Sequence, residues 1–156
     1  MDGPSTSGHL VMLHLGRTRV ALTQRAVRSL EATADVDFSA RSDGALGAID
    51  VGGSRWRVYA LDEELAPLHT APRDRRICAL LAAEHGLFGL LCDDAQVLPR
   101  RALVTYPLPP AMRRVASPVE GVLNLDPGVA LLSSSRGLAL AAGIATIDAA
   151  APLVRP

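Results

Sequence analysis

Apolar segments of five to seven residues recur along this chain, and each pair is joined by a short turn rich in glycine or other turn formers. Two such segments joined by a short turn are typical of a β-hairpin. Strand-length segments recur while long helical patterns do not, which favours an all-β barrel or sandwich over a βαβ sheet. The four predicted turns lie at residues 16–19, 52–53, 84–86 and 126–128.

The connections between the hairpins contain little regular structure. Residues 24–36 have Ala26, Val27 and Leu30 at helical spacing, which predicts a short helix or an irregular turn. Five prolines between residues 99 and 120 exclude an interior strand there, and we expect a loop with one short helix at 111–115. The alanine-rich end, from Arg136, predicts a short strand and then a helical tail. We expect one domain at residues 9–145, between a disordered tail at 1–8 and a flexible tail at 146–156.

The composition limits the possible functions. Apolar residues make up 49% and aromatic residues 3%, so the core must consist of Val, Leu, Ala and Ile. Sixteen basic and sixteen acidic residues cancel, which does not favour nucleic acid as a partner. All the basic residues are arginine, which excludes Schiff-base and P-loop lysine chemistry. The N-terminus lacks signal-peptide features and Arg136 interrupts the longest apolar run, so we expect a cytoplasmic protein without membrane insertion.

Candidate catalytic groups are few. Cys78 and Cys92 are too few for a disulfide framework or a zinc site, and we expect buried free thiols and no cofactor. A site with Cys92 as nucleophile would need His85 and Asp93, yet His85 lies in the turn, about 20 Å along the strand from Cys92. Gly52-Gly53 is not part of a phosphate-binding motif, so a turn is expected there. A small hydrolase or ligand-binding β-barrel that uses these residues remains an alternative.

The order of the hairpins resembles the CheW-like family, the coupling proteins of bacterial chemosensory arrays. Four segments carry the resemblance: "LVMLHLGRTRVALTQRAVRSL", "GAIDVGGSRWRVYALDEEL", "RRICALLAAEHGLFGLLCDDAQVL" and "VEGVLNLDPGVALLSSSRGLA". The resemblance implies two small five-stranded β-barrels around a shared hydrophobic core. It also implies an adaptor without catalysis, which bridges the cytoplasmic tips of methyl-accepting receptors and the regulatory domain of a histidine kinase, at membrane-associated arrays.

The second of these segments differs from the family pattern at polar positions. The family's arginine in N-L-R-G falls on Gly52 here, its asparagine on Asp50 and the proline of the next strand on Arg57. These differences suggest a divergent member, and the alternative is a module that caps or localises an array without coupling a kinase. The predicted protein-interaction residues within the resembling segments are Gly47, Asp50, Gly52, Gly53, Arg55, Arg57 and Asp93. The arginine pair Arg100-Arg101, next to a loop, is predicted to contact an acidic partner.

Overall fold

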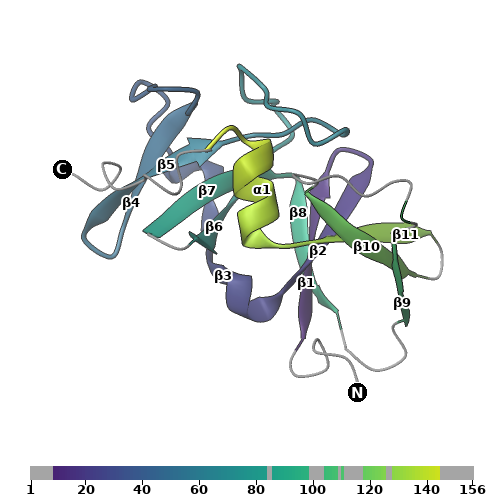
Figure 1. Ribbon diagram of the computed structural model, residues 1–156. Coiled ribbons are helices and arrows are strands. Elements are labelled where there is room, and N and C mark those ends of the chain that lie inside the picture. Colours follow the sequence, from purple (N-terminus) through teal and green to yellow (C-terminus); the bar gives the residue numbers. More distant parts are fainter. Residues whose placement is uncertain are drawn as a thin grey trace.

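The computed structural model describes residues 9–83, 86–98, 104–108, 110, 118–125 and 128–144. The expected tails at 1–8 and 146–156 lie outside these residues. So do His85, the expected short helix at 111–115 and two predicted interaction residues, Arg100 and Arg101. Within the described part, the elements form two sheets with one α-helix between them (Figure 1).

The larger sheet has six strands in the order β8-β1-β2-β11-β10-β9 and lies on the right in Figure 1. All neighbouring strands are antiparallel except the parallel pair β2 and β11. The strands are β1 (Leu10–Leu15), β2 (Thr18–Thr23), β8 (Asp94–Leu98), β9 (Val104–Pro107), β10 (Val119–Asn124) and β11 (Val129–Ser133).

The smaller sheet has five strands in the order β3-β6-β7-β5-β4. The strands are β3 (Val27–Ala32), β4 (Gly47–Val51), β5 (Ser54–Tyr59), β6 (Ile77–Ala83) and β7 (Gly86–Cys92). After β3, Asp37 pairs with Ala48 of β4, donating to its carbonyl at 2.7 Å, so the segment joins the two edges of the sheet. The expected all-β class is confirmed, although one sheet has six strands rather than five.

Three apolar clusters form the cores on the faces of the two sheets. The central core lies between them and takes residues from both, for example Leu13 and Val20 from one sheet and Leu81 and Leu90 from the other. The second core lies on the opposite face of the five-stranded sheet and includes Val58 and Cys78; we call it the barrel core. The third core lies on the opposite face of the six-stranded sheet. Aliphatic side chains dominate all three, as the composition predicts.

The predicted hairpins are confirmed as antiparallel strand pairs, although residues 84–85 and 126–127 of two predicted turns lie outside the described residues. At the best-defined one, Gly52 and Gly53 join β4 to β5 with φ of +66° and +81°, and this backbone conformation favours glycine at both turn positions. Val58 and Ala60 are buried in the barrel core and Trp56 packs against it, so this hairpin faces the core as predicted.

The short helix or irregular turn expected after Thr23 is wrong for most of that segment. Only Gln24–Ala26 form a 3₁₀ turn, and Val27–Ala32 are strand β3, paired with β6. A β-bulge follows Val27, so Val27 and Leu30 lie opposite Leu81 and Ala79, two residues of the central core. The extra residue places side chains three positions apart on one face of a strand, and this spacing imitates a helix.

The expected strand near Arg136 is also wrong, because Ser135–Ala141 form helix α1. Ser134 is its N-cap, and the Ser134 hydroxyl accepts a hydrogen bond from the Gly137 N–H at 2.9 Å. Leu138 and Ala139 bury one face of the helix in the central core. The cap and this buried face explain why an alanine-rich segment forms a helix here.

Candidate protein-interaction site

The outer face of the β4–β5 hairpin carries paired charges. Arg55 lies opposite Asp50 in the strand register, and its Nε and Nη2 donate to the two Asp50 carboxylate oxygens at 2.9 and 3.2 Å. Arg55 Nη1 also lies 3.6 Å from Asp37 Oδ2, and Arg57 Nη2 lies 3.8 Å from Asp43 Oδ2. We call these five residues the hairpin charge cluster, which contains three of the predicted site residues.

Local hydrogen bonds and charges shift the pKa values of two residues in this cluster, and both shifts favour the charged form. The Ser39 hydroxyl and N–H both donate to Asp37 Oδ1, at 2.5 and 3.0 Å, and lower the pKa of Asp37. The hydrogen bonds and charge of Asp50 raise the pKa of Arg55. The cluster is solvent-exposed, so it presents fixed charges to a partner and contributes little to folding stability.

The predicted glycines have structural roles. Gly47 is buried, and a Cβ atom there would lie 2.6 Å from the Asp37 carbonyl oxygen. Only glycine therefore allows the segment that carries Asp37 to approach β4. Gly52 and Gly53 form the exposed turn, with open space around them. None of the three brings a side chain to the hairpin charge cluster.

Asp93 lies elsewhere, between β7 and β8, where the chain passes from one sheet to the other. Asp93 Oδ1 lies 2.8 Å from Nε of Arg75, which is only 5% exposed. The backbone N–H of Asp93 donates to the carbonyl of His14 at 2.8 Å. Arg75 Nη1 also donates to the carbonyl of Leu91 at 3.2 Å. The described contacts of Asp93 therefore tie the crossing point together and do not involve the hairpin charge cluster.

The described residues do not support a cysteine nucleophile. Cys92 is fully buried in the central core and Cys78 in the barrel core, and burial raises the pKa of each thiol to about 12. Asp93 pairs with Arg75 rather than with a histidine, and His85 lies outside the described residues. Within the described ranges, no three His, Cys, Asp or Glu side chains gather to hold a metal ion, and no helix is long and apolar enough to cross a membrane.

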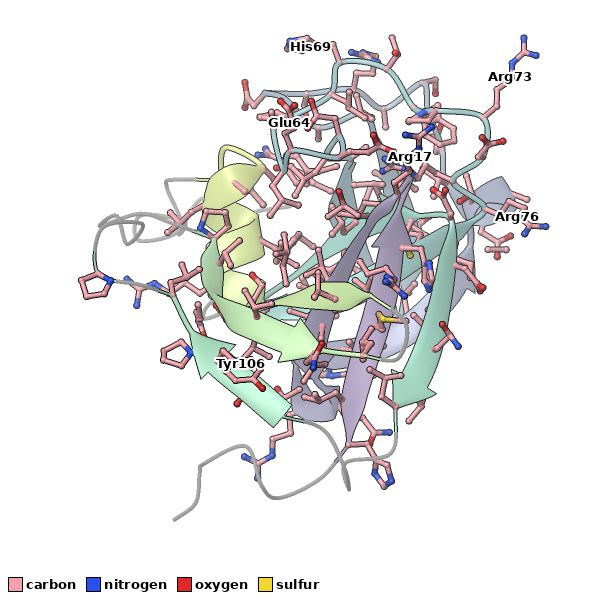
Figure 2. All side chains as sticks on the ribbon, turned by 90° about the vertical axis from the view of Figure 1, so that its right-hand side faces the viewer. Arg17, Glu64, His69, Arg73, Arg76 and Tyr106 are labelled. Atoms are coloured by element: carbon pink, nitrogen blue, oxygen red, sulfur yellow. The ribbon has the colours of Figure 1, made fainter. Side chains whose placement is uncertain are left out.

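Sequence reasoning missed an apolar surface on the six-stranded sheet. The strand register aligns one row of side chains on the same face: Tyr106, Val122, Leu131, Val20 and Leu13, from β9 through to β1. Val20 and Leu13 are fully buried in the central core, whereas Tyr106 is 51% exposed (labelled in Figure 2). The central core thus continues outward as a partly exposed surface.

We call Tyr106, Val122, Val129 and Leu131 the apolar ledge. Val129 shares this face and is 50% exposed. Part of the ledge lies on β9, in the proline-rich segment that was expected to be a loop. Pro107 ends this edge strand, a position where proline is tolerated. The apolar alternation of β10 and β11 was visible in the sequence, but the strand order that exposes it was not.

Comparison with known proteins was informative only at the level of structure. No protein-family model matches the sequence, and no curated protein matches it either. The crystal structure of the scaffolding protein TtCheW from Thermoanaerobacter tengcongensis superposes with a TM-score of 0.59 and 19% sequence identity. The similarity covers 81% of this chain and 88% of that one. The fold of this chain is CheW-like.

Close packing inside the CheW-like fold explains another glycine of the resembling segments. A Cβ atom on Gly89 of β7 would lie 2.6 Å from Cys78 Sγ and 3.0 Å from Cγ2 of Val58, in the barrel core. Gly89 pairs with Leu80 on one side and with Val58 on the other. The absence of a side chain at residue 89 therefore lets β6 and β5 close the barrel around β7.

Proposed function

We propose that this protein is a non-catalytic adaptor of a bacterial chemosensory pathway. It couples methyl-accepting receptors to a histidine kinase, in chemotaxis or in pilus-based motility. The observation that carries the proposal is the CheW-like fold, shared over most of both chains with a solved scaffolding protein. The protein acts in the cytoplasm, at receptor arrays.

Two separate surfaces support a bridging role. The hairpin charge cluster lies on the five-stranded sheet and the apolar ledge on the six-stranded sheet. A bridging protein needs such separation, because each partner must bind without covering the other's surface. We assign the kinase regulatory domain to the apolar ledge and the receptor tip to the hairpin charge cluster. Apolar burial suits a long-lived complex, whereas exposed charges suit steering and orientation.

Binding to both partners tests the proposal directly. The purified chain is mixed with the regulatory domain of the kinase and the cytoplasmic receptor fragment encoded near its gene. We expect micromolar or tighter binding to each, and a three-component complex when both are present. The absence of binding to either partner at micromolar concentration would contradict the adaptor role.

Gly52 favours a second candidate, a CheW-like module that localises or caps an array without coupling a kinase. Gly52 occupies the position of the family's arginine and has φ of +66°, so it offers no side chain to a partner. The test is Gly52→Arg in a coupling-deficient strain, with Gly52→Ala as the control for backbone strain. Kinase control that only the arginine variant restores supports a weakened coupler, and unchanged control by both variants supports the localising module.

A further inference from the structure

The turn that follows β5 of the five-stranded sheet forms hydrogen bonds with the β1–β2 turn of the six-stranded sheet. Glu63 follows β5, and its Oε2 accepts a hydrogen bond from the Arg17 N–H at 2.6 Å. Its backbone carbonyl accepts a second hydrogen bond, from the Thr18 hydroxyl at 2.5 Å. A Cβ atom on Gly16 would lie 2.5 Å from Glu63 Oε2, so the carboxylate occupies the space that a side chain at residue 16 would need.

The turn that presents Glu63 is itself firmly anchored. Leu61 is fully buried and Leu65 is 8% exposed, and both belong to the central core. Asp62 Oδ1 accepts hydrogen bonds from the N–H groups of Glu64 and Ala66, at 2.8 and 2.9 Å. Leu65 adopts φ of +62°, a costly conformation for a branched side chain that the surrounding contacts maintain. Glu63 is thus held at a defined position above the central core.

The junction between the sheets combines apolar packing with directional hydrogen bonds. Most of the contact between the sheets is aliphatic packing in the central core, and apolar burial is non-directional. Hydrogen bonds between Glu63 and the β1–β2 turn restrict orientation, because they weaken steeply when donor and acceptor are misaligned. Figure 2 shows Arg17, whose N–H donates to Glu63, and Glu64, the residue after Glu63, at the same end of the molecule.

We propose that Glu63 is a clamp that fixes the orientation of the six-stranded sheet relative to the five-stranded sheet. Removing its contacts leaves both sheets folded and widens the range of their relative orientations. The clamp does not depend on which partners the protein binds. In an adaptor, it would keep two partner-binding surfaces in a constant geometry.

Spin labels on the two sheets test the clamp. Cysteines are introduced at Asn124 of β10 and Ala32 of β3, both exposed, and pulsed electron paramagnetic resonance measures the distance distribution between the labels. The native thiols are buried and stay unlabelled. We expect Glu63→Ala to broaden the distribution and to accelerate hydrogen exchange of the Arg17 amide by about tenfold.

Glu64→Ala is the matched control, because the Glu64 side chain is exposed at the next residue while its N–H contact is retained. It should leave both measurements unchanged. Thr18→Val removes only the hydroxyl contact and should broaden the distribution to a smaller extent; it decides the matter if Glu63→Ala fails to fold. If the Glu63 variant folds and its distance distribution is as narrow as that of the control, the proposal is overturned. If the Glu63 variant does not fold, an equally narrow distribution in the Thr18 variant overturns it.

Discussion

Ser39 lowers the pKa of Asp37 through two hydrogen bonds, and a single substitution can isolate the effect of its hydroxyl group. The pKa of Asp37 is lowered, so the interaction stabilises the fold above the ordinary aspartate pKa, and this contribution is lost as pH falls through the lowered value. Ser39→Ala should raise the pKa of Asp37 towards its ordinary range. Carboxyl carbon chemical shifts recorded against pH measure this, and Ser42→Ala, an exposed serine nearby, should leave the pKa unchanged.

The two cysteines give a second prediction at the residue scale. With a pKa of about 12, only about one thiol in 100,000 is ionised at pH 7, and both sulfur atoms are buried. A thiol reagent such as dithionitrobenzoate should therefore not react with the folded protein, and should modify both cysteines after denaturation. Rapid modification of Cys92 in the folded state would instead revive the hydrolase alternative.

At the scale of elements, the ion pair between Arg75 and Asp93 stabilises the passage from β7 to β8. Because Arg75 is buried and Asp93 is mostly buried, Arg75→Ala leaves a poorly solvated carboxylate. We expect the free energy of unfolding to fall by about 3 kcal/mol, the lower end for a broken buried pair. Chemical denaturation measures this change.

Arg76→Ala provides the control for this variant, because Arg76 is the adjacent arginine and its side chain is exposed. Its effect should stay within about 0.5 kcal/mol. A loss in the Arg75 variant no larger than in this control would mean that solvent satisfies Asp93, and that the pair does not hold the junction.

Elements were predictable where their signal was local. The hairpins at Gly16 and at Gly52-Gly53 follow from a turn of suitable residues between two apolar segments. Strand β3 was not predictable in this way, because its bulge gives Val27 and Leu30 a helical spacing and the pairing with β6 depends on residues about fifty positions away. The ion pair of Asp93 with Arg75 was also missed, although it lies beside one hairpin: Arg75 precedes β6 and Asp93 follows β7, and the pairing of Ile77 with Cys92 brings them together.

At the scale of the whole molecule, the charge pairing of the predicted site follows from one hairpin, whereas the apolar ledge depends on strands that are distant in the sequence. Asp50 and Arg55 pair across one hairpin, so their proximity follows from its turn. The ledge depends on β9, β10 and β11 being placed at the far side of β2 by a parallel pairing. No short segment of sequence specifies that placement, because it results from how the central core is shared.

The last prediction concerns the ledge as a partner surface. Val129 of β11 and Val97 of β8 are similarly exposed, at 50% and 56%, but only Val129 lies on the ledge. Val129→Asp should weaken binding of the kinase regulatory domain by about tenfold or more, because an unpaired charge would be buried in an apolar contact. Val97→Asp should not change the affinity, and both variants should retain receptor binding. Titration calorimetry measures each affinity, and equal effects of the two substitutions would place the kinase surface elsewhere on the molecule.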